Sequence, residues 1–325
     1  MRVVDARLAT LEEWNAAWAR CDWASYFQSR SWADVWHRWR PGTYEPRAFA
    51  LQLEDGLSVV LPMVIEHRAG GLLRVARLSV ADTYGGWLSA VEMTPPHAAA
   101  IVSWAQDTLG DMTWAMNPYD PTIAGRQYPD ALVRATLVVN LSQGFDAIRG
   151  GWSKGHRSAV SQAQRLGVAV RLATDRSEWD AYGACYSASF RRWGDSSGAP
   201  AWGVIRSLSE EPSDAVSLLV ATSGGSVVSG AICLTDRHVM TYWHAASLPE
   251  GLRIRAPTLL VQEAIRMAVN SGRRVFDLGG SGGHEGVERF KLGFRPERLA
   301  YSILVHEGRT LKMARKARDV RRTLH

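Results

Sequence analysis

The stretch Phe276-Asp-Leu-Gly-Gly-Ser-Gly-Gly-His-Glu-Gly-Val-Glu-Arg-Phe-Lys-Leu-Gly-Phe294 places a cluster of glycines directly after a run that reads as a buried strand. Backbone amides with no side chains beside them can approach an oxyanion or a phosphate. A flexible loop at a strand end has the same composition. The stretch lacks the Gly-Lys-Ser/Thr of a P-loop, and the acidic Glu285-Gly-Val-Glu stands where a dinucleotide-binding GxGxxG would open a helix. Neither nucleotide motif is therefore expected.

Lysine is rare in this chain, and one lysine lies inside that stretch. Only four of the 38 basic residues are lysines: Lys154, Lys291, Lys312 and Lys316. Lys291 follows Phe290 in an apolar, glycine-containing frame just after the glycine cluster. A lysine there can stabilise a tetrahedral oxyanion or hold a phosphate as a point charge. The pattern by itself also fits a surface lysine on a hairpin.

The two halves of the chain repeat one order of elements. In the first half we expect helices at 11–20 and 32–39, strands at 47–53, 57–65 and 72–80, a helix at 95–109, and strands at 112–116 and 132–141. In the second half we expect helices at 153–166 and 178–193, strands at 168–172, 215–222, 226–234 and 239–246, a helix at 257–270 and a strand at 274–278. Matching elements lie about 165 residues apart, which predicts a tandem duplication. The expected fold is α/β (α+β layered), with domains 1–145 and 146–325 that meet between Ser142 and Gly151.

Charge is divided unevenly between the halves. Residues 1–145 hold 12 basic and 15 acidic groups, whereas residues 146–325 hold 26 and 17. A basic second half suggests an anionic partner such as RNA, a nucleotide, a phospho-sugar or CoA, although solubilising surface charge explains it equally well.

Other features narrow the class of protein. The three cysteines, Cys21, Cys185 and Cys233, lie far apart, so we expect neither a metal site nor a disulfide scaffold. The first residues lack an apolar core of signal-peptide length, and no run approaches eighteen apolar residues. We therefore expect a soluble, cytoplasmic protein with no transmembrane segment.

Three further sites carry chemically useful side chains. Lys154 and Arg157 are neighbours near the start of an expected helix, where a basic edge suits an anion. Arg192 lies among aromatic residues that can stack on a base or sugar. His244, on an expected strand, can act as a general base or be a satisfied core residue.

The whole chain resembles the FemABX-like branch of the GNAT superfamily, whose members have two tandem GNAT-like domains and include peptidoglycan bridge-forming aminoacyltransferases and related N-acyltransferases. The most specific matching pieces are Asp277-Leu-Gly-Gly and the following Phe290-Lys291. Supporting pieces are Phe27-Gln-Ser-Arg-Ser-Trp, Thr83-Tyr-Gly-Gly, Trp152 to Gly167 with Arg157, the Tyr182 to Trp202 region, and Tyr242 to Ser247.

The resemblance implies roles for individual residues. Lys291, with Phe290, would lie at the reaction centre, and Asp277, Gly279 and Gly280 would belong to its loop. The cleft that binds the acceptor would be lined by Tyr84, Gly85, Gly86, Arg192, Trp202 and Tyr242. Trp202 stands where the family commonly has a tyrosine. Two family features are missing from the sequence: the long helical hairpin of some bridge-forming members, and a recognisable GNAT pyrophosphate loop before the helix that Pro257 opens.

We therefore expect an N-acyltransferase in which an amine attacks an activated acyl group without a covalent enzyme intermediate, since no Gly-x-Ser-x-Gly motif is present. The proton of the attacking ammonium would pass to Asp82, His244 or water.

The expected donor is aminoacyl-tRNA, because the second half of the chain is basic and so is the C-terminal stretch Lys312-Met-Ala-Arg-Lys-Ala-Arg-Asp-Val-Arg-Arg. We expect no bound cofactor. The acceptor would be a peptidoglycan precursor or a small-molecule amine. One alternative is an acyl-CoA-dependent enzyme that modifies an amino sugar or metabolite. Another is a non-catalytic tandem module that binds a nucleotide-sugar or RNA. The oligomeric state is left open.

Overall fold

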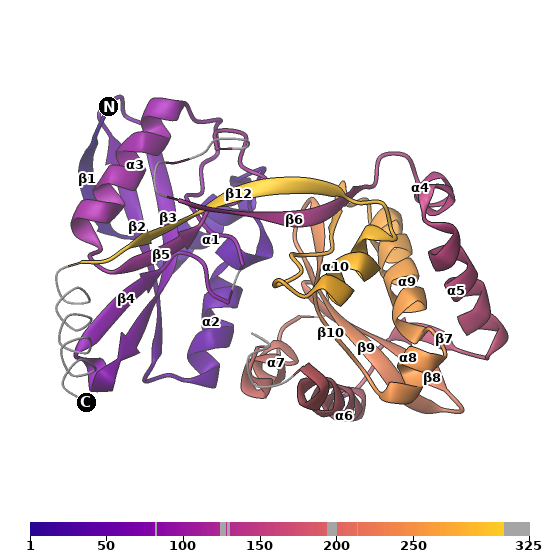
Figure 1. Cartoon of the computed structure of the whole chain (residues 1–325). Coiled ribbons are helices and arrows are strands. Elements are labelled where there is room, and N and C mark those ends of the chain that lie inside the picture. The colour runs from indigo at the N-terminus through magenta and orange to yellow at the C-terminus, as the bar shows by residue number, and fades with distance from the viewer. Residues whose placement is uncertain (82, 124–127, 129–130, 194–199, 213, 309–325) are drawn as a thin grey trace, which may run out of the picture. The chain divides into compact units, whose positions relative to one another are not determined.

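The computed structural model describes residues 1–81, 83–123, 128, 131–193, 200–212 and 214–308. These residues form two compact units, each built as a mixed, mostly antiparallel sheet flanked by helices (Figure 1). The predicted α/β class is thereby confirmed. In this part of the chain, no helix is both long enough and apolar enough to cross a membrane.

The first unit comprises residues 1–134 and takes in the chain again at residues 300–308. Its strands follow the order β1-β2-β3-β4-β5-β12. The elements are β1 (Val3–Leu8), α1 (Leu11–Arg20), η1 (Tyr26–Gln28), α2 (Arg30–Trp39), β2 (Tyr44–Leu53), β3 (Ser58–Arg68), η2 (Ala69–Gly71), β4 (Leu73–Arg77), α3 (Pro95–Thr108), β5 (Met112–Ala115) and β12 (Glu297–His306). Helices α1 and α2 cover one face of this sheet, and α3 covers the other (Figure 1).

Local sequence explains the helices of the first unit. Helix α1 begins with a capping box, in which the Thr10 hydroxyl accepts from the Glu13 amide at 3.2 Å and the Glu13 carboxylate accepts from the Thr10 amide at 2.8 Å. The tryptophans of α2 form an edge-to-face series, with the Trp32 and Trp36 rings 5.7 Å apart and both side chains buried. This stripe is therefore part of the core.

The second unit comprises residues 135–299, and its strands follow the order β6-β11-β10-β9-β8-β7. The elements are β6 (Leu132–Asn140), α4 (Phe145–Gly151), α5 (Lys154–Arg165), β7 (Ala169–Leu172), α6 (Arg176–Trp193), α7 (Trp202–Leu208), β8 (Val216–Ser223), β9 (Ser226–Thr235), β10 (Val239–Ser247), α8 (Pro249–Arg253), α9 (Ala256–Asn270), β11 (Val275–Asp277) and α10 (Glu285–Leu292).

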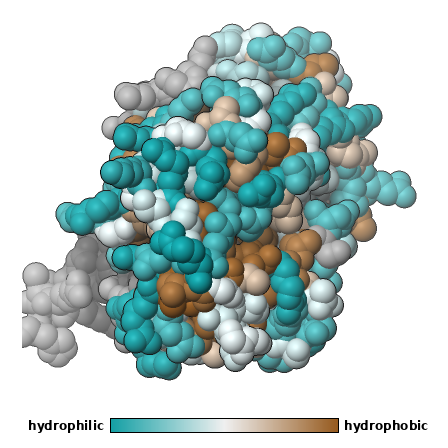
Figure 2. Space-filling model, turned by 90° about the vertical axis from the view of Figure 1, so that its right-hand side faces the viewer, coloured by the Kyte–Doolittle hydropathy of each residue, from teal (hydrophilic) through white to brown (hydrophobic). Residues whose placement is uncertain are grey.

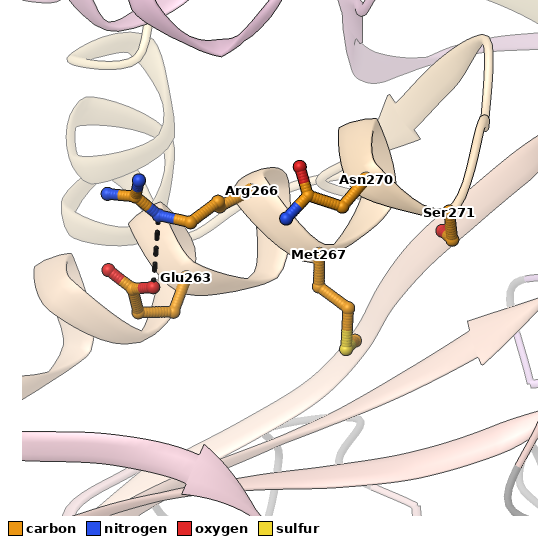
Figure 3. A pocket seen from close by; sticks show the side chains of 5 residues that line it. All are labelled: Glu263, Arg266, Met267, Asn270 and Ser271. Carbon is orange, nitrogen blue, oxygen red and sulfur yellow. Dashed lines mark ion pairs between the residues drawn. The ribbon is translucent and has the colours of Figure 1, made fainter.

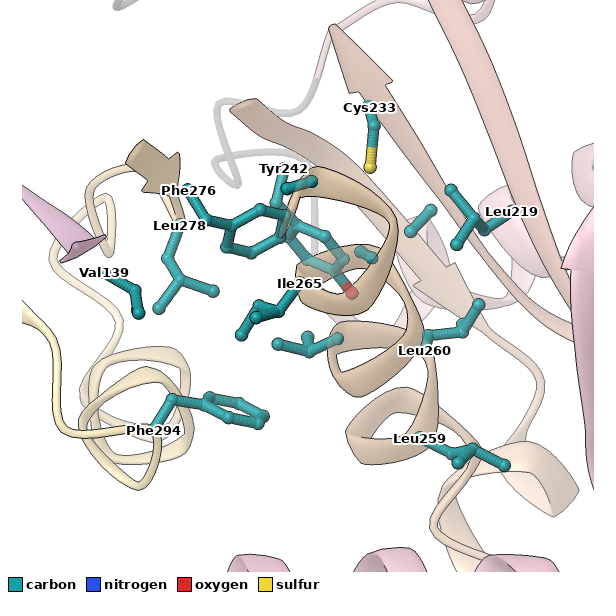
Figure 4. Packing of buried hydrophobic residues seen from close by; sticks show 14 of the residues in the cluster. Val139, Leu219, Cys233, Tyr242, Leu259, Leu260, Ile265, Phe276, Leu278 and Phe294 are labelled. Carbon is teal, nitrogen blue, oxygen red and sulfur yellow. The ribbon is translucent and has the colours of Figure 1, made fainter. Parts of the chain in front are cut away.

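Helix α9 is the centre of the second unit's core. Its buried side chains, among them Leu260 and Ile265, belong to one hydrophobic cluster with Phe276 and Leu278 from β11 and its exit and with Phe294, which follows α10 (Figure 4). Helices α4 and α5 pack against α9, while α6 packs on the other side of the strands. The glycine segment after β11 thus leaves directly from the packed core of this unit.

The repeat predicted from the sequence is confirmed, since β1 to β5 with α1 to α3 recur in the same order as β7 to β11 with α6, α7 and α9. The units, however, divide at residues 134 and 135 rather than at 145 and 146. The reason lies in the last strands. Strand β6 pairs with β11, with Val138 opposite Asp277, whereas β12 pairs with β5, with Ile303 opposite Ala115. The second unit's sheet is therefore completed by β6, which we expected in the first half, and the first unit's sheet by β12, which lies in the second half of the sequence.

Hydrophilic side chains cover most of the face seen in Figure 2, and hydrophobic side chains form small groups within it. A shallow groove runs along the last turns of α9 and is lined by Glu263, Arg266, Met267, Asn270 and Ser271 (Figure 3). Within it, Arg266 Nε lies 3.2 Å from a Glu263 oxygen. None of the candidate site residues lines this groove, so the site must be sought elsewhere.

Candidate functional site

The candidate site begins where two parallel strands separate. Strands β10 and β11 pair from Val239 and Val275 to Thr241 and Asp277. There β11 ends, while β10 continues to Ser247 with a register shift against β9 between Tyr242 and His244. The carboxyl ends of parallel strands are common positions for ligands in α/β folds. Asp277 is thus placed at the point of separation.

Asp277 organises the turn that follows it. The side chain is fully buried, and its Oδ1 accepts hydrogen bonds from the Gly279 amide at 2.8 Å and from the Thr136 hydroxyl on β6 at 2.5 Å. Gly279 has a φ of +72°, which a residue with a Cβ rarely adopts. The carboxylate therefore fixes the first glycine of the segment in a left-handed conformation.

Lys291 lies over this turn. Its Nζ donates to the carbonyl oxygen of Gly280 at 2.7 Å and to that of Gly279 at 3.4 Å. Burial lowers the pKa of Lys291 to about 8, and the Asp277 carboxylate opposes part of this shift. Among the described residues, only these two carbonyls accept from Nζ, which leaves a third N–H for a substrate oxygen. We call Asp277, Gly279, Gly280 and Lys291 the lysine site.

Lys291 belongs to a helix, not to a hairpin. Helix α10 begins at Glu285, shortly after the glycines, so the acidic residues that argue against a dinucleotide-binding motif are compatible with a helix here. Acidic side chains in the first turn, Glu285 and Glu288, and basic ones in the last, Arg289 and Lys291, complement the helix dipole. That charge order is the signal in the sequence that predicts α10.

Helix α5 anchors the end of α10. The Ser153 amide, at the start of α5, donates to the Gly293 carbonyl at 2.9 Å, and His156 Nε2 lies 2.8 Å from the Phe290 carbonyl oxygen. Arg157, expected to bind an anion, donates from Nη1 to the carbonyls of Gly150 and Trp152. Its charge thus stabilises the end of α4.

The remaining candidate on α5 is exposed. Lys154 is the first residue of that helix, and its side chain faces solvent. Ser153, directly before it, is the residue bonded to α10. An anion contact by Lys154 stays a prediction.

His244 is the centre of an aromatic cluster. Its Nδ1 lies 2.6 Å from the Tyr182 hydroxyl, and the Tyr186 ring centroid is 5.7 Å away. Trp202 packs 5.3 Å from Tyr186. Burial lowers the pKa of His244 to about 4, so its imidazole is neutral at pH 7. The neutral ring could accept a proton, as a general base must, but it is packed among aromatic side chains.

Two further acceptor candidates of this unit differ in exposure. Tyr242 is 7% exposed, and its ring packs 6.2 Å from Phe276 in the core, a position that disfavours a large substrate contact. Arg192, on α6, is exposed and donates to the Ser189 hydroxyl at 3.0 Å. Of the two, Arg192 keeps a charged group available at the surface.

The candidates of the first unit form a tightly packed corner. The Tyr84 ring is buried and meets the Phe27 and Tyr301 rings edge-on, at 5.8 and 5.1 Å. A Cβ on Gly85 would lie 1.6 Å from the Leu78 carbonyl oxygen, and Gly86 has a φ of +143°. These glycines have structural reasons to be glycine. Asp82, the other candidate here, lies outside the described residues, as does the basic C-terminal stretch.

The cysteines do not offer a nucleophile. Cys185 and Cys233 are fully buried, and burial raises their pKa values to about 11 and about 12. The nucleophile is the thiolate, which is scarce at neutral pH when the pKa is this high. Among the described residues, no group of three or more His, Cys, Asp or Glu side chains is placed to hold a metal ion.

Comparison with known proteins agrees with this architecture. Residues 153–292, which include the lysine site, match the sequence model of the acetyltransferase (GNAT) domain. No curated protein sequence matches the chain.

Solved structures show the same fold at low sequence identity. FemX aligns with a TM-score of 0.67 at 12% identity, over 92% of this chain and 97% of that chain. The C-terminal domain of a protein assigned as a lysylphosphatidylglycerol synthetase from Agrobacterium fabrum aligns with a TM-score of 0.56 at 14% identity, over 86% and 90%. A tandem GNAT protein from the clavulanic acid biosynthesis pathway aligns with a TM-score of 0.54 at 10% identity, over 93% and 98%.

Proposed function

The chain has a FemABX-like fold of the GNAT superfamily, and we propose that it is an N-acyltransferase that moves an aminoacyl group from aminoacyl-tRNA to an amine acceptor. The observation that carries this proposal is the lysine site. A partly buried ammonium is held by two carbonyls at the end of β11, inside the segment that matches the GNAT domain.

In the proposed reaction the acceptor amine attacks the ester carbonyl of the donor. A C–N bond forms, the carbonyl oxygen becomes an oxyanion, and Lys291 Nζ donates to it. The ester C–O bond then breaks, and the ribose oxygen leaves as a hydroxyl with the proton that the amine gives up. Asp82, His244 and water are the candidate carriers of that proton. The protein contributes position and charge, with no covalent intermediate.

The choice of tRNA as donor rests on charge. The second half of the chain carries 26 basic against 17 acidic residues, and Lys154 and Arg165 are exposed on α5. A thioester of CoA is the alternative donor. The observation that supports this alternative is the match to an acetyltransferase domain. For the acceptor we propose an amine of a peptidoglycan precursor or of a small metabolite. The resemblance to bridge-forming aminoacyltransferases supports this class.

A donor trial tests the function. Purified full-length protein is incubated with pooled aminoacyl-tRNAs or with acyl-CoA thioesters and a panel of amines, and amide products are followed by mass spectrometry. We expect amide formation with aminoacyl-tRNA. We also expect charged tRNA to bind at least roughly tenfold more weakly when salt rises from about 50 to about 200 mM. Product only from CoA thioesters, or tRNA binding without salt dependence, would contradict the tRNA assignment.

The pH dependence of kcat tests the protonation state of Lys291. Because its pKa is lowered to about 8, the ammonium is present below that pH and is lost as pH rises through it. We therefore expect kcat to fall above about pH 8. In Lys291→Arg, a weaker enzyme, this decline should be absent, because arginine stays charged. A wild-type kcat that rises steadily through pH 9 would instead indicate that Lys291 acts as a base.

A further inference from the structure

His156, a residue of α5, packs its side chain against the end of α10. Its Nε2 lies 2.8 Å from the Phe290 carbonyl oxygen, and its ring centroid lies 4.5 Å from that of Phe294 and 5.5 Å from that of Phe290. A Cβ on Gly293 would lie only 2.0 Å from the ring. The imidazole therefore occupies the space that a side chain at position 293 would fill.

These contacts fall on both sides of Lys291. Phe290 precedes the lysine directly, and Gly293 follows it by two positions. The His156 ring therefore contacts the turn of α10 that carries Lys291. The Ser153 amide adds a bond to the Gly293 carbonyl at 2.9 Å. Since a change in the orientation of this turn moves the lysine side chain, the distance from Nζ to the Gly280 carbonyl depends on the α5 contact.

The contact with the Phe290 carbonyl requires a proton on Nε2 of the imidazole. A carbonyl oxygen can only accept, so Nε2 must donate to Phe290. Nδ1 then faces the Ser153 hydroxyl, 3.2 Å away. Burial lowers the pKa of His156, in agreement with a neutral ring at pH 7. An apolar residue of similar size would fill the space but would not donate to the carbonyl.

We propose that His156 is a positioning residue for Lys291: through the Phe290 carbonyl and the bare Gly293 backbone it fixes the last turn of α10, and so holds the lysine ammonium over the Gly279 and Gly280 carbonyls. The link to catalysis rests on the proposed acyl transfer, but the link from His156 to the lysine ammonium does not.

The test compares His156→Leu with His156→Gln in the full chain. Glutamine keeps an N–H donor near the position of Nε2, whereas leucine fills space only. Gln164→Leu is the matched control, because Gln164 is an exposed polar residue of the same helix. Thermal unfolding and circular dichroism show whether each variant is folded.

The first readout does not need substrate. Trace labelling of amines across about pH 6 to 11 gives the titration of Lys291 by peptide mass spectrometry, with the exposed Lys154 as internal reference. In His156→Leu we expect the midpoint of Lys291 to rise by about one unit, because the ammonium gains solvent. His156→Gln and Gln164→Leu should keep the wild-type midpoint. An unchanged midpoint in folded His156→Leu would overturn the proposal.

The second readout is acyl transfer. We expect His156→Leu to lower kcat by roughly tenfold to a hundredfold with little change in KM, and His156→Gln to recover most of it. Equal kcat in folded His156→Leu and wild type would also overturn the positioning role. If the wild-type protein transfers no acyl group at all, the proposed function fails, and the labelling result still decides the role of His156.

Discussion

Replacing Lys291 with alanine is expected to lower kcat by roughly 10²- to 10³-fold, the usual effect of removing one donor to an oxyanion. The side chain contacts two backbone carbonyls at the end of β11, and its remaining N–H is available to the substrate. Because the oxyanion exists only in the transition state, KM should change by less than about threefold. Single-turnover measurements with saturating donor isolate this chemical step.

The control for this substitution is Arg289→Ala. Arg289 is a cationic residue of the same helix, two positions before Lys291, and its side chain is exposed. Its loss removes the same formal charge from α10 but leaves the lysine site intact, so turnover should stay within about twofold of wild type. A turnover of Lys291→Ala within tenfold of wild type would contradict the role assigned to this lysine.

The sequence predicts the repeated order of elements well because long amphipathic helices and meanders have strong local patterns. It does not predict which sheet receives the last strands. That choice depends on pairing between distant residues: β6 supplies Leu137 and Val139 to the second unit's core and places Val138 opposite Asp277. Strand β1 was not predicted either, since its side chains are mostly exposed and show no alternation of burial.

The candidate site likewise contains residues that the local sequence suggests and a contact between distant residues that it does not. The glycines, Asp277 and Lys291 are adjacent in sequence to a strand, so a motif can suggest them, and the structure brings them together. The role of His156 was not predicted, because it depends on a contact with Phe290 across 134 positions of the chain. A histidine in a basic helix carries no mark of such a contact. Conversely, Arg157 fits an anion site in sequence but is bonded to backbone carbonyls.

Gly85 poses the same question of substrate contact against packing. The residue was expected beside the acceptor, yet a Cβ there would lie 1.6 Å from the Leu78 carbonyl oxygen and 2.6 Å from its carbon. Both atoms are backbone and cannot rotate away. Gly85 is also held from both sides, since its amide donates to the Ala115 carbonyl at 2.8 Å and its carbonyl accepts from the Asn117 amide at 3.0 Å.

Gly85→Ala is therefore expected to reduce the free energy of unfolding by at least about 3 kcal/mol, beyond the usual cost of overpacking. The matched control is Gly42→Ala in the same unit, where no atom lies within 4 Å of the added Cβ, and there the change should stay within about 1 kcal/mol. Urea unfolding followed by tryptophan fluorescence measures both, because Trp87 and Trp114 are buried near this corner.

The two explanations of Gly85 separate when stability and turnover are measured together. If packing is its main role, Gly85→Ala loses stability, and any folded fraction transfers acyl groups at the wild-type rate per folded molecule. If Gly85 instead leaves room for the acceptor, the variant stays as stable as Gly42→Ala, and KM for the acceptor rises. The 1.6 Å approach to a backbone oxygen favours the first outcome, because relief requires the chain at Leu78 or Gly85 itself to move.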